Sequence, residues 1–161
     1  MLLTTTQKIK TLFAVFTVAF VLNLIWENAQ APLYQGYTSF GQHFWICLPA
    51  SLWDAGYITI VYLLFTLTTH EWNVIQKSPD QDKSVSWIIM LLPAVLGLVT
   101  ATIIELRALS EGRWAYTAAM PIVPIIHVGA TPFLQLAILS LATYTIVAHY
   151  ERKKISHSPH L

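Results

Sequence analysis

Four apolar runs divide this chain of 161 residues, and each approaches or exceeds the ~20 residues that a helix needs to cross a hydrocarbon core. The runs extend over residues 11–27, 43–68, 85–105 and 120–149. The composition agrees with them, because 55% of the residues are hydrophobic and only 11% are charged. We therefore expect an all-α integral membrane four-helix bundle. Residues 1–150 form its single four-span domain, and residues 151–161 form a tail.

The positions of Lys and Arg indicate the direction of the spans. The cytoplasmic loops of membrane proteins carry an excess of these residues close to the membrane. Seven of the nine lie on one side of a four-span protein, with only Arg107 and Arg113 opposite. The seven are Lys8, Lys10, Lys77, Lys83, Arg152, Lys153 and Lys154. We therefore predict an N-in/C-in topology, with residues 151–161 as a basic cytoplasmic tail.

Charge and cysteine content exclude several classes of function. The formal net charge is +1, and no basic stripe is large enough to neutralise several phosphates, so nucleic acid is not expected as a partner. Cys47 is the only cysteine, which rules out a disulfide framework and a thiolate metal cluster. Its place inside an apolar run is typical of a small packing residue.

Two acidic residues lie where a membrane-spanning chain can least easily hold them. Asp54 is midway along the second run, and Glu105 closes the third. An ionisable group at such a depth costs a few kcal/mol or more, so it is first interpreted as a functional site. Asp54, the deeper of the two, is the stronger candidate.

Other polar residues follow helical spacing within each run, where positions three or four apart share a face. The stripes are Asn23, Glu27 and Gln30; Ser51, Asp54 and Tyr57; Thr102 and Glu105; and His127, Thr131 and Gln135. Lipid cannot satisfy such stripes, so they should face one another. With both termini cytoplasmic, the stripes predict a polar cavity near the outer leaflet. In the alternative interpretation, many of these side chains only hold helices together.

The third connection carries the two remaining cations among acidic and aromatic residues. Such an arrangement suits either a lattice of ion pairs or a clamp for an anion. We expect Arg113 to be drawn inward, to Glu27, Glu105 or Asp54.

Together these patterns give one candidate site. Its predicted catalytic residues are Asp54, Glu105, Glu27 and His127. Its predicted ligand-binding residues are Asn23, Gln30, Trp53, Tyr57, Arg107, Arg113, Trp114, Tyr116 and Gln135. The sequence indicates no cofactor and no metal site; a haem or metal bound by His127 with the carboxylates is a minor alternative.

Two stretches carry a resemblance to known proteins. The first runs from Trp26-Glu27 to Leu33-Tyr34, and the second from Glu105 through Gly112-Arg113-Trp114-Ala115-Tyr116 and Pro121 to Gln135. They resemble a family of small uncharacterised multi-pass bacterial membrane proteins. More distantly, the C-terminal half resembles membrane lycopene cyclase and carotenoid-modifying domains. In those cyclases acids follow the proline of the last helix, whereas here Pro132 is followed by Phe133, Leu134 and Gln135.

Three functions fit this sequence. The first is an enzyme of the bacterial inner membrane that acts on an isoprenoid or other apolar lipid by acid catalysis. It would use a buried acid and the aromatic faces of Trp53, Tyr57, Trp114 and Tyr116. The second is a non-enzymatic binder or carrier of a lipid or small molecule. The third is an assembly subunit, including a homo-oligomer, whose polar stripes join helices.

Overall fold

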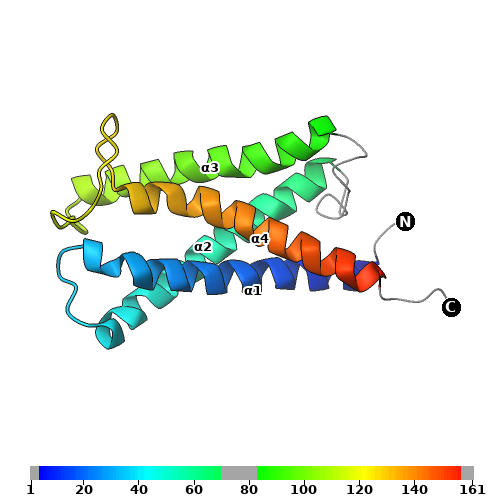
Figure 1. The fold of residues 1–161 in the computed structure, drawn as a ribbon, viewed down its shortest axis with the longest axis horizontal. Helices are drawn as coiled ribbons and strands as arrows, with labels where there is room; N and C mark the ends of the chain where they lie inside the picture. Colours follow the sequence, from blue (N-terminus) through cyan, green and yellow to red (C-terminus); the bar gives the residue numbers. More distant parts are fainter. Residues whose placement is uncertain (1–3, 70–82, 157–161) are drawn as a thin grey trace.

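The structure is a computed structural model that describes residues 4–69 and 83–156. Within these ranges the chain forms four α-helices and one short 3-10 helix (Figure 1). They are α1 (Thr5–Gln30), η1 (Ala31–Leu33), α2 (Phe40–Thr69), α3 (Lys83–Ser110) and α4 (Ala130–Ser156). All four α-helices are long and apolar enough to cross a membrane, which confirms the predicted all-α bundle. Residues 70–82 and the last part of the predicted tail, residues 157–161, lie outside the described ranges.

The helices do not pack equally against one another. α1 lies along α2 and α4, and α3 lies along α4, whereas α2 makes few contacts with α3 or α4. Figure 1 shows the start of α1 and the end of α4 at one end of the bundle, as four spans require, with α2 running obliquely to the others. α2 and α3 approach each other near this end and diverge toward the opposite end. That opposite end, which carries residues 31–39 and 111–129, is called the distal end below.

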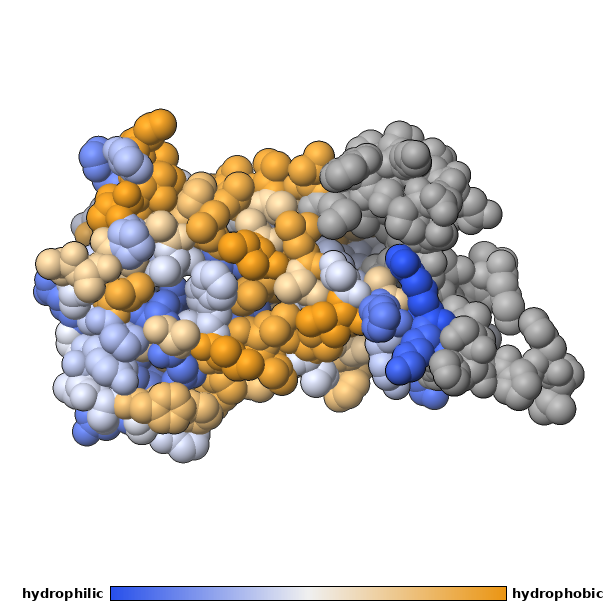
Figure 2. Space-filling model, in the orientation of Figure 1, coloured by the Kyte–Doolittle hydropathy of each residue, from blue (hydrophilic) through white to orange (hydrophobic). Residues whose placement is uncertain are grey.

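The apolar core fills the helix contacts with small and medium side chains. Val15 and Ala19 of α1, Ala55 and Ile58 of α2, and Val147 of α4 are almost fully buried. Many large apolar residues face outward, and Figure 2 shows a hydrophobic band across the middle of the face in view, with hydrophilic residues at the distal end. This distribution is typical of helices whose outer surfaces contact lipid.

The fourth span differs from its prediction. We expected it over residues 120–149, but α4 begins only at Ala130. Pro121 and Pro124 explain the difference, because each lacks the backbone donor that a helix interior requires. Pro132 is tolerated because it lies in the first turn of α4, where no intrahelical partner is needed. The other three helices begin and end a few residues beyond their predicted limits.

Residues 120–129 form a compact hairpin, called here the outer hairpin. Ala130 N donates to Pro121 O at 2.7 Å, and Val123 N donates to Val128 O at 2.9 Å. The apex is closed by His127 N, which donates to Val123 O at 2.9 Å. His127 has a φ of 53°, in the left-handed region that few side chains adopt.

Candidate functional site

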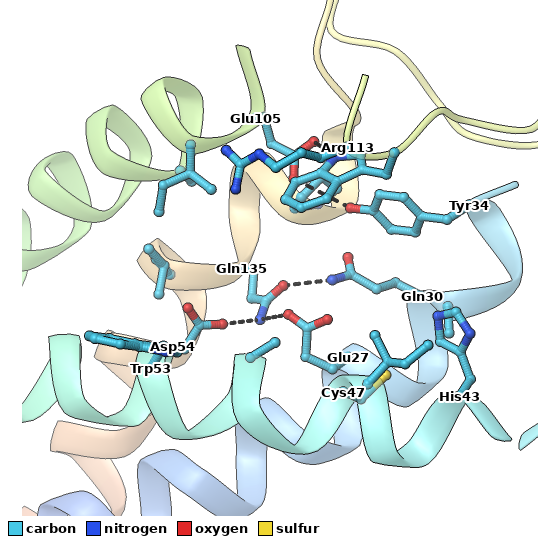
Figure 3. Close-up of a pocket in the computed structure, with 18 of the residues that line it drawn as sticks. Glu27, Gln30, Tyr34, His43, Cys47, Trp53, Asp54, Glu105, Arg113 and Gln135 are labelled. Atoms are coloured by element: carbon cyan, nitrogen blue, oxygen red, sulfur yellow. Dashed lines mark hydrogen bonds between the residues drawn. The ribbon is translucent and has the colours of Figure 1, made fainter. Parts of the chain in front are cut away.

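A cleft of about 750 Å³ lies at the distal end, between the diverging parts of α2 and α3 (Figure 3). α1 and α4, together with Asp54 of α2, form its floor, and the connections 31–36 and 113–114 lie along its rim. Most of its wall is apolar or aromatic, including Ile46, Trp53, Ile104 and Leu136. The polar side chains in the floor come from three helices that are distant in sequence. They are the predicted Glu27, Gln30, Asp54 and Gln135.

Gln135 of α4 is the centre of this polar cluster. Its side-chain nitrogen lies 2.7 Å from a carboxyl oxygen of Glu27 and 2.8 Å from one of Asp54. The same nitrogen lies 3.1 Å from the Asn23 side-chain oxygen, and Gln30 donates to the Gln135 oxygen at 2.8 Å. Figure 3 shows the two carboxyls on either side of the Gln135 amide. The predicted convergence of the polar stripes of α1, α2 and α4 therefore occurs through one side chain.

The cluster contains more hydrogen-bond acceptors than donors. The Gln135 amide has two hydrogens, and three acceptor oxygens lie within reach of its nitrogen. The Asn23 amide donates to Ala19 O at 2.8 Å within its own helix. The Gln30 oxygen is buried and has no hydrogen-bond partner in the described part of the chain. Neither Glu27 nor Asp54 forms an ion pair with a described residue.

Glu105 has a different environment, although it lines the same cleft. Its carboxyl accepts from the Tyr34 hydroxyl at 3.4 Å, from Trp114 Nε1 at 3.2 Å and from the Tyr116 hydroxyl. The Tyr116 oxygen in turn accepts from the backbone N–H of Gly129 at 2.9 Å. Burial, with the nearby Glu105 carboxyl, raises the pKa of Tyr34 and Tyr116 above their ordinary value, so both phenols stay neutral donors.

The two distal connections bring these aromatic side chains together. Gln35 N donates to Ala115 O at 2.8 Å, and Thr117 N donates to Leu33 O at 2.9 Å. These bonds pair the segment after η1 with the segment after α3, so that Tyr34 lies opposite Tyr116. The Tyr34, Trp114 and Tyr116 side chains, called here the aromatic clasp, thereby reach Glu105.

The expected inward pairing of Arg113 is wrong. Arg113 Nε lies 2.9 Å from the carboxyl of Glu111, and its guanidinium stacks over Trp114 at 5.2 Å from the ring centroid. Arg107 Nε also pairs with Glu111, at 2.7 Å. Glu111 is close in sequence to both arginines, so it reaches them without the long approach that Glu27, Glu105 or Asp54 would need. The Arg113 side chain nevertheless lines the cleft, whereas Arg107 points to the exterior.

The structure places most of the predicted site residues in the cleft but excludes His127. Glu27, Asp54 and Glu105, of the four predicted catalytic residues, line it. So do Gln30, Trp53, Tyr57, Arg113, Trp114 and Gln135. Asn23 and Tyr116 contact it only through Gln135 and Glu105. His127 is exposed on the outer hairpin, so the predicted helical stripe of His127, Thr131 and Gln135 is wrong at its first member.

Several cleft residues were not singled out by their sequence pattern. Tyr34 ends the first of the two stretches that resemble known proteins. Its aromatic side chain next to Pro32-Leu33 is the sequence feature that could have indicated a place in the site. Thr100 contacts the Tyr57 hydroxyl at 3.0 Å and joins α3 to α2, whereas the expected Thr102 donates to Leu98 O in its own helix. His43 and Cys47 also line the cleft.

Within the described ranges, no three His, Cys, Asp or Glu side chains form a group that could hold a metal ion. The arrangement can instead exchange protons between two neighbouring carboxyls and a molecule held against apolar and aromatic walls. No protein-family model, curated protein or solved structure matches this chain.

Proposed function

We propose that this protein is a membrane enzyme in which Glu27 and Asp54 transfer protons to and from an apolar lipid bound in the cleft. The observation that carries the proposal is the position of Gln135, whose one nitrogen lies within hydrogen-bond distance of both carboxyls. Two acids held side by side in an apolar wall provide a proton donor and a proton acceptor within reach of the same bound molecule.

The opening of the cleft supports a lipid as the substrate. α2 and α3 make few contacts, and at the distal end the cleft separates them. Trp53 on α2 is 81% exposed and Ile104 on α3 is 42% exposed, although both line the cleft. Because these helices have the length and composition of membrane spans, the space between them opens toward the hydrocarbon layer. An acyl or isoprenoid chain can therefore reach the acids without passing through water.

The charge of the cluster supports acid–base chemistry. Two half-buried carboxylates without a cationic partner among the described residues would be costly in an apolar bundle, so the pair holds a proton between them. One carboxyl can then add that proton to one carbon of a double bond. The other alkene carbon then carries the positive charge, and the second carboxylate removes a proton from the next carbon beyond it, so that the double bond shifts by one position and the pair regains its proton. The ring faces of Trp53 and Tyr57 can stabilise the carbocation that exists between these two proton transfers.

An isoprenoid is the substrate class we favour, since its branched double bonds give tertiary cations on protonation. This choice agrees with the distant sequence resemblance to lycopene cyclase and carotenoid-modifying domains. We further propose that the protein resides in a bacterial inner membrane, with the cleft toward the outer leaflet, as its Lys and Arg distribution predicts.

A second candidate function is non-enzymatic binding or transport of a lipid or small molecule. It is favoured by the shortage of donors in the cluster, because the Gln30 oxygen, which has no partner among the described residues, can accept a hydrogen bond from a ligand hydroxyl or ammonium group. Glu27 and Asp54 would then hold the ligand without exchanging protons with its carbon atoms.

Deuterium incorporation separates the two functions. The purified protein, with the lipids that accompany it, is incubated in D2O in the wild-type form and as Asp54→Asn. The lipids are then analysed by mass spectrometry. We expect deuterium bound to carbon in the wild-type sample and a loss of at least ~100-fold in Asp54→Asn, the size of a general acid contribution. The Asn oxygen can still accept from Gln135, so the folded yield should remain close to that of wild type.

Glu151→Gln is the matched control, because it removes a carboxylate from the opposite end of the bundle and should leave incorporation unchanged. A bound lipid that takes up no deuterium in the wild-type protein would overturn catalysis and favour binding. Equal incorporation in Asp54→Asn would overturn the assigned role of Asp54.

A further inference from the structure

The outer hairpin, residues 120–129, carries an apolar apex on a fixed base. At the base, Val128 is fully buried and Met120 is 4% exposed. The Gly129 N–H donates to the Tyr116 hydroxyl at 2.9 Å, which ties the base to the aromatic clasp. At the apex, Ile125 is 90% exposed, the largest exposed fraction among the large apolar side chains of the described residues.

The apex is held in place by its backbone. Two cross-strand hydrogen bonds join its arms, and Pro124 fixes one φ angle at the turn. The His127 N–H closes the turn on Val123 O at 2.9 Å. An isoleucine at the end of such a structure cannot easily turn inward to bury its side chain.

The direction of the hairpin indicates what covers the apex. Figure 1 shows it projecting sideways, across the direction of the helices, at the level of the distal turns of α3. In those turns Val99, Ile103 and Leu106 are exposed, and α3 is a candidate membrane span from Leu91 to Ser110. The apex therefore extends away from the bundle at a depth where α3 itself still faces lipid. Figure 2 shows it as an apolar projection at the upper left.

The chemistry of the apex fits the boundary between headgroups and acyl chains. Residues 120–129 contain no Lys, Arg, Asp or Glu, and His127 is their only titratable side chain. An exposed apolar tip without charged side chains can enter the interface between headgroups and acyl chains without desolvating an ion.

We propose that the outer hairpin inserts residues 124–126 into the interfacial layer of the leaflet around the distal end. The hairpin would thereby fix the depth and rotation of the bundle relative to the lipid. The inference rests on the exposure and direction of the hairpin and is independent of any chemistry in the cleft.

Spin-label accessibility tests the insertion. A nitroxide is attached to Ile125→Cys in a Cys47→Ala background, and the protein is placed in nanodiscs of phosphatidylethanolamine and phosphatidylglycerol. Collision with oxygen reports lipid, and collision with a nickel chelate reports water. We expect the label at 125 to collide with oxygen several-fold more often than with the chelate. A label on Ser39→Cys, an exposed position on the connection before α2, should show the opposite ratio.

Two results would overturn the insertion. Chelate collisions at 125 as frequent as those at 39 would place the apex in water. Protection from both reagents, with dipolar broadening that disappears when unlabelled protein is added, would show that a second copy of the chain covers the apex.

Discussion

The side-chain amide of Gln135 donates to the carboxyl of Asp54 at 2.8 Å and so joins α4 to α2, two helices that otherwise make few contacts. The same nitrogen lies 2.7 Å from Glu27 on α1. The hydrogen bonds of this one amide therefore connect α1, α2 and α4 at the floor of the cleft. A group in this position orients the acids and also holds the distal end of the bundle together.

Gln135→Leu should therefore lower the free energy of unfolding by about 1–3 kcal/mol, because it leaves buried polar groups without their donor. Thermal unfolding in detergent measures the effect. Gln42→Leu is the control, since it removes a glutamine at an exposed position of the distal end and should change stability by no more than about 0.5 kcal/mol. Equal stability of the two variants would show that Gln135 does not hold the helices together.

Glu105 has three described donors and should behave as an anchor for the aromatic clasp. We expect wild type to be the most stable, Glu105→Gln to be less stable and Glu105→Leu to be the least stable, because Gln keeps one acceptor oxygen and Leu keeps none. The rate of limited proteolysis within residues 111–129 should be lowest for wild type, higher for Glu105→Gln and highest for Glu105→Leu. A Glu105→Gln variant that keeps its stability but loses all deuterium incorporation would instead give Glu105 a chemical role.

The clasp also predicts a response to alkaline conditions. Tyr116 has a folded-state pKa raised above its ordinary value of 10.0, by burial first and by Glu105 second. Its contribution to stability is therefore fully present below pH ~10 and is lost as the pH rises above that value. Thermal unfolding between pH 8 and ~11 should show a steeper loss for wild type than for Tyr116→Phe. Parallel curves would contradict the assigned burial.

The cluster around Gln135 could be predicted largely from sequence. Asn23, Glu27 and Gln30 share one face of a continuous helix. Lipid cannot form hydrogen bonds with these side chains, so this face must point into the bundle. The cost of exposing Asp54 to lipid directs it inward in the same way. Helical spacing and the cost of burial were sufficient here, because every residue involved belongs to a regular helix.

The partners of Glu105 could not be predicted in this way. Tyr34, Trp114 and Tyr116 reach it from two connections whose mutual pairing follows no helical period. The start of α4 was misplaced for a related reason. Hydropathy counts Pro121 and Pro124 inside an apolar run, although their missing backbone donors interrupt the helix. Local backbone chemistry decided both features.

Gly97 allows α3 and α4 to approach closely, and this contact gives a further prediction. A Cβ at position 97 would lie 2.8 Å from the backbone nitrogen of Ala137, so Gly97→Ala must push the helices apart. We expect a loss of about 1–3 kcal/mol, as for other overpacked contacts. Gly56→Ala on α2 meets nothing within 4 Å and should be neutral or slightly stabilising, since Ala favours a helix. Equal unfolding temperatures for the two variants would contradict the close contact.

The exposed position of His127 leads to a prediction that separates backbone conformation from side-chain chemistry. Because its φ is 53°, glycine should adopt the same conformation with less strain, so His127→Gly should keep or slightly raise the unfolding temperature. His127→Val should lower it, since a branched side chain fits the left-handed region poorly. Deuterium incorporation into the bound lipid should not change in His127→Gly, as the side chain does not belong to the described cleft lining. A large loss of incorporation in a stable His127→Gly variant would restore the catalytic role that the helical spacing had predicted.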